Sequence, residues 1–134
     1  MNAKLRIIAL TLICMTVTAG TALAGPDNPL GSLKFTKEMV SGKTMSSSGY
    51  PNGTITFNTN GSMTCTNYPA FVTCKSWQIE PDGSLHREFT DSHTGSLVEV
   101  RAYWKLLSNN GSTLQVSQTS NNSTGETTLT VTYR

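Results

Sequence analysis

This chain of 134 residues has few charged side chains, since only 13% of its residues are Asp, Glu, Lys or Arg. No run of Lys and Arg is present to follow a phosphate backbone, which argues against nucleic acid as a partner. The sequence also lacks the roughly 20 uninterrupted apolar residues that a membrane-spanning helix needs, because Thr16, Thr18 and Gly20 interrupt its longest apolar segment. The length fits one domain.

Motifs that support catalysis are absent as well. The sequence has no Gly-x-Ser-x-Gly elbow and no phosphate-binding loop, and its carboxylates are scattered. Its two histidines, His86 and His93, stand near Glu88 and Asp91, but their spacing matches no zinc-binding pattern. Solvated polar residues on the wet face of a strand explain them more simply than a metal site does. We therefore expect no enzymatic activity, no metal and no cofactor.

Residues 1–24 have the layout of a secretory signal peptide. Lys4 and Arg6 give a positive start, residues 7–17 form an apolar core, and Ala22-Leu23-Ala24 is a small-residue exit. Cleavage is expected after Ala24, which places the mature protein in the periplasm or outside the cell, with no membrane span.

Loss of this leader changes the charge and the cysteine count. Removing Lys4 and Arg6 leaves eight basic residues, which balance the eight acidic ones, so the net charge falls from +2 to zero. Cys14 leaves with the leader, and Cys65 and Cys74 remain. A pair of cysteines in an exported chain predicts a disulfide, which stabilises a short loop by roughly 2–3 kcal/mol.

The mature sequence reads as a series of short strands. Residues 25–42 predict an irregular arm with one helical turn over 36–40, capped by Thr36. From Lys43 onward, apolar and polar residues alternate with the period of two that marks strands with one buried face. The alternation predicts about eight strands, near residues 43–47, 54–58, 62–67, 72–80, 84–90, 97–107, 113–119 and 127–133.

Turn residues separate these strands. The turn sequences, each rich in the residues that favour tight hairpins, are Pro51-Asn52-Gly53, Asn60-Gly61, Pro81-Asp82-Gly83 and Asn110-Gly111. Consecutive hairpins predict an all-β antiparallel up-and-down meander over residues 43–134, which best hides its edges by closing into a small barrel. A flattened sandwich is the structural alternative. The apolar phase changes within 71–79, so we expect a bulge near Cys74 and Lys75.

Six short segments follow one another along the chain in a familiar order: Ser41-Gly42-Lys43-Thr44, Thr54-Ile55-Thr56-Phe57, Asn60-Gly61, Trp77-Gln78-Ile79, Asp82-Gly83-Ser84-Leu85 and Tyr103-Trp104-Lys105-Leu106. This order resembles that of small exported bacterial lipocalin-like (calycin) barrel domains. The resemblance covers most of the chain from about Ser41, and barrels of this class include small-ligand carriers and periplasmic protease inhibitors with one disulfide. The lipocalin opening motif places a Trp shortly after its Gly, whereas Lys43, Thr44 and Met45 follow Gly42 here. The resemblance therefore implies a barrel fold more than a particular function.

The interior of such a barrel is either filled by side chains or holds one small ligand. We expect the ligand-binding residues of the interior to include Phe57, Trp77, Arg87 and Trp104. Arg87 is unusual because it shares the inward phase of Leu85 and Phe89 and would need an anionic partner, such as a ligand carboxylate. The alternatives are that Arg87 snorkels to the rim, that the register slips, and that both tryptophans are core residues.

The disulfide loop is a second candidate site. Tyr68 and Phe71 lie inside it, and a constrained aromatic loop is a preorganised surface for a protein partner. The alternative is that Phe71 plugs the barrel end. The sequence therefore predicts a monomeric, non-catalytic binding module for a small apolar or lipid-like ligand. The other functions left open are an inhibitor or adaptor that binds another exported protein through its arm (25–32) and loops, and an envelope stability factor.

Overall fold

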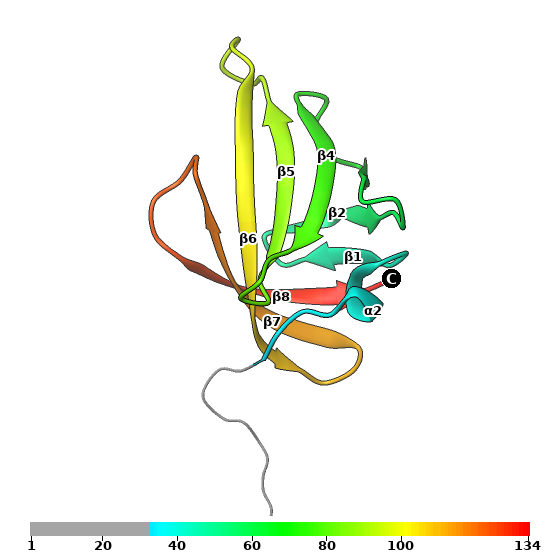
Figure 1. Cartoon of the computed structure of the whole chain (residues 1–134). Coiled ribbons are helices and arrows are strands. Elements are labelled where there is room, and N and C mark those ends of the chain that lie inside the picture. Colours follow the sequence, from blue (N-terminus) through cyan, green and yellow to red (C-terminus); the bar gives the residue numbers. More distant parts are fainter. Residues whose placement is uncertain (1–32) are drawn as a thin grey trace, which may run out of the picture. The chain divides into compact units, whose positions relative to one another are not determined.

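The computed structural model describes residues 33–134, so the expected signal peptide and the arm over 25–32 lie outside the described residues. Alternating apolar and polar residues form eight strands joined in one sheet (Figure 1). They are β1 (Thr44–Ser47), β2 (Tyr50–Phe57), β3 (Met63–Thr66), β4 (Val72–Ile79), β5 (Leu85–Asp91), β6 (Val98–Asn109), β7 (Thr113–Ser120) and β8 (Thr127–Tyr133).

The strands follow one another around a nearly closed barrel. Their order is β3-β2-β1-β8-β7-β6-β5-β4, and each neighbouring pair is antiparallel. The pairing of β1 with β8 joins the two ends of the chain's meander, as in an up-and-down barrel. The predicted all-β fold is confirmed, and the barrel is compatible with a calycin-like fold.

The seam between β3 and β4 is the one place where sequence neighbours in the barrel form no ladder. A single bridge joins Ser62 to Ser76, and the backbone N–H of Trp77 donates to the carbonyl of Gly61 at 2.9 Å. The sulfur atoms of Cys65 and Cys74 lie within bonding distance across this seam, with Cα atoms 5.8 Å apart. The predicted cysteine pair therefore joins the two sides of the seam where backbone hydrogen bonds are few.

Three of the four predicted turns are confirmed. Gly61, Gly83 and Gly111 take positive φ values of 90°, 87° and 100° at the hairpin ends. The turn predicted at Pro51-Asn52-Gly53 was wrong, because β1 and β2 are joined at Ser48 and Gly49.

Residues 51–54 instead form a bulge within β2. Met45 pairs with Ile55 and Ser47 with Tyr50, so four residues of β2 oppose Ser46 alone. Proline is tolerated at such a bulge because its missing N–H is not needed for the ladder. The bulge predicted near Cys74 and Lys75 is confirmed by a register shift between Cys74 and Ser76.

The predicted helical turn is the short helix α2 (Lys37–Val40). Thr36 occupies its N-cap position, but the threonine side chain makes no capping hydrogen bond, so the predicted cap was wrong. Packing holds the helix in place instead, because Val40 is fully buried and the Tyr133 hydroxyl donates to the Met39 carbonyl at 3.0 Å.

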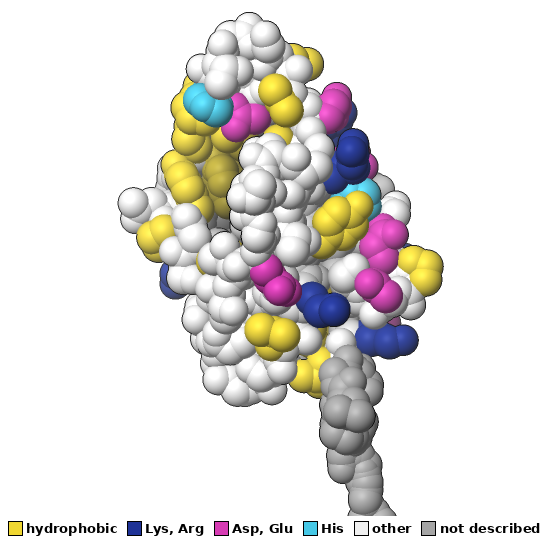
Figure 2. Space-filling model, turned by 90° about the vertical axis from the view of Figure 1, so that its left-hand side faces the viewer, with side chains coloured by type: hydrophobic (Ala, Val, Ile, Leu, Met, Phe, Trp, Pro, Cys, Tyr) yellow, Lys and Arg dark blue, Asp and Glu magenta, His cyan; other side chains and the backbone are white. Residues whose placement is uncertain are grey.

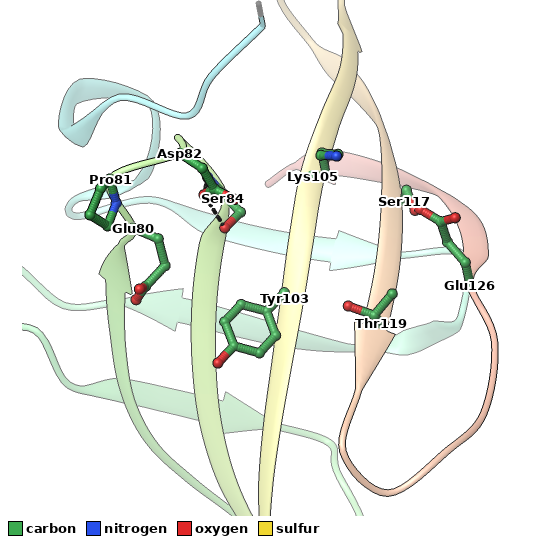
Figure 3. Close-up of a pocket in the computed structure, with 9 residues that line it drawn as sticks. All are labelled: Glu80, Pro81, Asp82, Ser84, Tyr103, Lys105, Ser117, Thr119 and Glu126. Carbon is green, nitrogen blue, oxygen red and sulfur yellow. Dashed lines mark hydrogen bonds between the residues drawn. The ribbon is translucent and has the colours of Figure 1, made fainter. Parts of the chain in front are cut away.

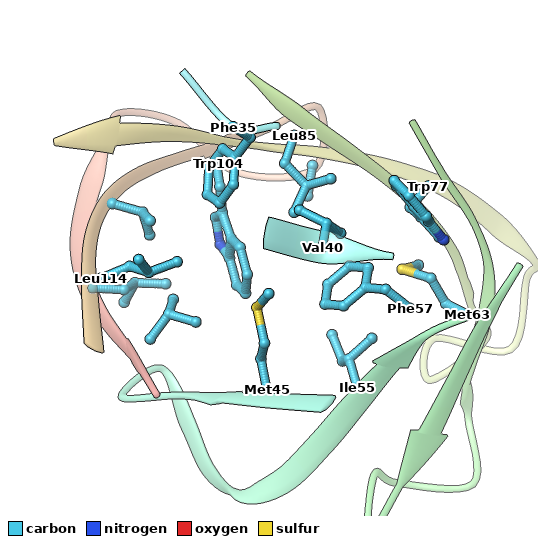
Figure 4. Packing of buried hydrophobic residues seen from close by; sticks show 14 of the residues in the cluster. Phe35, Val40, Met45, Ile55, Phe57, Met63, Trp77, Leu85, Trp104 and Leu114 are labelled. Carbon is cyan, nitrogen blue, oxygen red and sulfur yellow. The ribbon is translucent and has the colours of Figure 1, made fainter. Parts of the chain in front are cut away.

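The hydrophobic core fills the end of the barrel next to α2. Inward side chains from the strands meet Phe35 and Val40 there (Figure 4). Phe57 lies between the two tryptophans, with ring centroids 6.1 Å from Trp77 and 6.4 Å from Trp104. These large side chains are packed against one another, so this half of the barrel has a solid interior.

Candidate ligand site at the open end of the barrel

A cavity of about 230 Å³ lies at the end of the barrel opposite α2. Its walls come from the last residues of β1, β5 and β7 and the first residues of β2, β4, β6 and β8. Figure 2 shows a hollow bordered by hydrophobic side chains near the top of the molecule, where the β5–β6 hairpin projects in Figure 1. The residues that line the cavity are Ser47, Gly49, Tyr50, Tyr68, Val72, Arg87, Phe89, Thr90, Asp91, Val100, Ala102, Gln118, Ser120, Asn122 and Leu129.

Arg87 lies at the inner end of this cavity. In the β-ladder it stands between Trp77 of β4 and Ala102 of β6, which share its inward phase, and only 4% of its surface is exposed. Its guanidinium carbon lies 3.9 Å from the ring centroid of Trp104, so the cation stacks on the indole face. Arg87 points inward as predicted, and it neither snorkels to the rim nor slips in register.

The hydrogen bonds of Arg87 leave its charge uncompensated. Its Nη2 donates to Oε1 of Gln118 at 2.8 Å, whereas the buried Nε has no hydrogen-bond partner. Within residues 33–134, no carboxylate lies at ion-pair distance from it. Burial lowers the pKa of Arg87 to about 9, and the nearby Tyr68 partly opposes this change. A buried cation without an anion is costly, so this residue needs an explanation beyond packing.

Tyr68 reaches the same cavity from the loop between β3 and β4. Its ring stacks on Tyr50 with centroids 4.5 Å apart, and both rings lie against Gly53. A Cβ atom at Gly53 would stand 2.7 Å from each ring, so glycine is required for this close approach. Burial raises the pKa of the Tyr68 hydroxyl, which therefore stays protonated and can donate a hydrogen bond.

Phe71 behaves differently from Tyr68. It is 41% exposed, does not line the cavity, and packs at 5.4 Å against the ring of His93. The alternative in which Phe71 plugs the barrel end is therefore wrong. Leu97 and Val98 are also exposed, by 71% and 40%, so three apolar side chains are exposed at this end of the barrel.

The structure divides the interior residues predicted to bind ligand into two groups. Arg87 lines the cavity and stacks on Trp104, which belongs to the packed core and does not itself line the cavity. Phe57 and Trp77 are buried in the packed half and do not line the cavity.

Gln118 and Tyr50 are among the cavity residues that the sequence did not predict. Gln118 shares the inward phase of Leu114 and Val116 on β7, so the period-two pattern could have found it. Tyr50 could not be found, because the turn before it was placed three residues too late in the sequence.

A larger depression of about 480 Å³ lies on the outer face of β5, β6 and β7 (Figure 3). Its carboxylates and its two serines already have partners within the described residues. Asp82 accepts hydrogen bonds from the backbone and side chain of Ser84, Glu80 accepts from Gln78, and Ser117 donates to Glu126. These contacts lower the pKa of the Asp82 and Glu80 carboxyls. Two buried polar atoms in the described residues have no hydrogen-bond partner, Nε of Arg87 and Nε2 of His86, and neither residue lines this depression.

The two histidines are held by carboxylates at separate places. Nδ1 of His86 lies 3.1 Å from Glu80 and Nδ1 of His93 lies 2.8 Å from Asp91. His86 was expected to be solvated, which was wrong, because the ring of Tyr103 stacks on it at 4.6 Å and buries it. In the described part of the chain, no three or more His, Cys, Asp or Glu side chains are placed to hold a metal ion.

Comparisons with protein families, with curated proteins and with solved structures find no match for this chain. A function can therefore be proposed only from the fold and the cavity. Residues 33–134 contain no helix with the length and apolar character to cross a membrane.

Proposed function

We propose that this protein is a non-catalytic, exported binding module of the lipocalin-like type, which takes one small ligand into the open end of its barrel. The observation that supports this function most directly is Arg87, a buried cation with an orphaned Nε beside an open cavity. A buried charge lowers the stability of a domain, so its presence in a pocket is typical of a binding site.

The volume of the cavity limits the size of the ligand that it can hold. Pockets for drug-sized molecules measure about 300–1,000 Å³, and this cavity measures about 230 Å³. Because Phe57, Trp104 and Met45 fill the other half of the barrel, a long acyl chain has no room to extend inward. A compact ligand of one ring or a short chain suits the site better than a lipid.

An NMR screen tests this function. The ¹⁵N-labelled protein is titrated with a library of compact acids, amides, alcohols and amines. We expect at least one class to shift the backbone amide signals of Thr90, Gln118 and Ser120, which line the cavity. Arg87→Met abolishes these shifts, whereas Arg101→Met, which removes an exposed cation from the outer face of β6, leaves them unchanged. A library that shifts no cavity signal contradicts the proposal.

A second candidate function is the binding of another exported protein. The observation that favours it is the exposure of Phe71 and Leu97 beside the cavity mouth, where a partner would bury both. The double variant Phe71→Ser and Leu97→Ser would then lose a partner that wild type captures from a periplasmic extract. It would keep every small-molecule shift in the cavity, which separates the two functions.

A further inference from the structure

The side chain of Gln118 fixes the chemical character of the cavity. Its Oε1 accepts two hydrogen bonds, one from Nη2 of Arg87 at 2.8 Å and one from Nε1 of Trp104 at 2.7 Å. Guanidinium and indole N–H groups only donate, so the amide cannot turn over without losing both bonds. The Nε2 amide nitrogen is therefore the free end of a side chain that lines the cavity, and it has no hydrogen-bond partner within residues 33–134.

The charged and titratable groups around the cavity favour an acceptor as the ligand. Arg87, the Gln118 amide and the protonated Tyr68 hydroxyl all offer donors. The carboxylate on the wall is Asp91, and one of its oxygens, Oδ1, already accepts from the backbone N–H and the ring Nδ1 of His93, each at 2.8 Å. The inner part of the site therefore has donors in excess and lacks a counter-charge.

Besides the polar Ser47, Thr90, Ser120 and Asn122, the cavity is lined by five apolar side chains, those of Val72, Phe89, Val100, Ala102 and Leu129. An inorganic anion would leave these side chains in contact with water. An organic acid would cover them and place its charge at Arg87.

Resting on the ligand-binding function proposed above, we infer that the ligand is a compact monocarboxylic acid, whose carboxylate is held by Arg87 and the Gln118 amide while its apolar body covers Val100 and Leu129. Gln118 is then a specificity-determining residue. Its amide oxygen positions the guanidinium. Its amide nitrogen donates hydrogen bonds, so the group of the ligand next to it must be an anion or a neutral acceptor.

Matched acids and amides test this inference. Benzoate, phenylacetate and hexanoate are titrated by NMR at pH 7 alongside their primary amides, which have nearly the same shape but no charge. A hydrogen bond to a charged group is stronger than its neutral counterpart, so we expect at least one acid to bind about tenfold or more tightly than its amide. An amide that binds as tightly as its acid overturns the inference, as does inorganic phosphate that binds as tightly as benzoate.

Gln118→Glu is the sharpest variant, because it exchanges one NH₂ group for oxygen. The new carboxylate supplies the missing partner of Arg87, so we expect acid binding to fall by more than tenfold while the melting temperature stays equal or rises. Arg101→Met serves as the matched control on the outer face and keeps the acid affinity. Undiminished acid binding by Gln118→Glu contradicts the inference.

Failure of the inference and failure of the proposed function are distinguishable in the same titrations. Binding of amides, alcohols or amines without preference for acids overturns only the carboxylate assignment. The absence of any cavity shift with all compounds overturns the binding function itself.

Discussion

Arg87 combines two properties that rarely occur together in a stable protein, deep burial and the lack of an anionic partner. Its stacking on Trp104 and its bond to Gln118 offset part of the desolvation cost. The rest remains as a loss of stability, which the depressed pKa of the guanidinium reports. The proposed ligand site gives a reason why a residue is kept at such a cost.

Replacing Arg87 separates stability from binding. Arg87→Met keeps an unbranched side chain and removes the charge, so we expect the free energy of unfolding without ligand to rise by about 1–3 kcal/mol. Urea denaturation at pH 7 measures this change. Arg101→Met provides the control, and as a surface substitution it should alter stability by less than about 0.5 kcal/mol. If Arg87→Met instead destabilises the protein by a similar amount, Arg87 serves the core.

The pH dependence of the unfolding free energy, compared between wild type and Arg87→Met, provides a second test, and the direction of the expected change is known. Burial lowers the pKa of Arg87 in the folded protein to about 9, well below its ordinary value in the unfolded chain. Between these values the unfolded chain binds more protons than the folded one, so this group's contribution to stability rises with pH. The stability advantage of Arg87→Met over wild type should therefore be full below pH 9 and shrink above it.

At the scale of elements, the period-two pattern and the Asn-Gly turns predicted seven of the strands to within a few residues. β2 is the exception, because it begins at Tyr50 rather than near residue 54. Pro51, Asn52 and Gly53 are turn-forming residues in any sequence-based reading, yet here they form a bulge inside a strand. Local propensity could not reveal this, because the pairing of β1 with β8 fixes where β1 must end.

The β3–β4 seam depends on its disulfide more than a fully paired strand edge would. Because Ser62 and Ser76 form the only bridge between these strands, the double variant Cys65→Ala and Cys74→Ala should lose about 2–3 kcal/mol of unfolding free energy. Hydrogen exchange checks the location of the loss. Exchange of the Trp77 amide, which donates across the seam to Gly61, should become faster, while amides of the β7–β8 ladder keep their relative protection. Equal stability of the two proteins would show that packing alone closes the seam.

For the whole molecule, the sequence predicted which side chains face inward but not how much space they leave. Phe57 and Trp77 have the same inward phase as Arg87, and yet they fill the barrel while Arg87 borders a cavity. The difference depends on the position of each residue along the barrel axis and on the neighbouring strands, which a single-strand pattern does not contain. The compensating partner of Arg87, Gln118, comes from β7 and likewise depends on strand order.

The cavity wall also spans the β3–β4 seam, so ligand binding as proposed here would be coupled to the disulfide. Tyr68 stands in the loop that joins the two strands and stacks on Tyr50 of β2, whereas Val72 and Arg87 belong to β4 and β5. A ligand that contacts both groups holds the two sides of the seam together. By thermodynamic linkage, a change that loosens the seam must then weaken ligand binding.

This coupling is measurable with benzoate if benzoate is among the acids that bind. At 100 times its dissociation constant, the ligand should raise the unfolding free energy of wild type by about 2.7 kcal/mol. The variant Cys65→Ala and Cys74→Ala, at the same benzoate concentration, should gain less, because its looser seam lowers the affinity for the acid. Urea denaturation with and without benzoate gives both values, and Gln118→Glu serves as the control that gains almost nothing. Equal gains in wild type and the cysteine variant would show that the two sides of the cavity keep their positions without the disulfide.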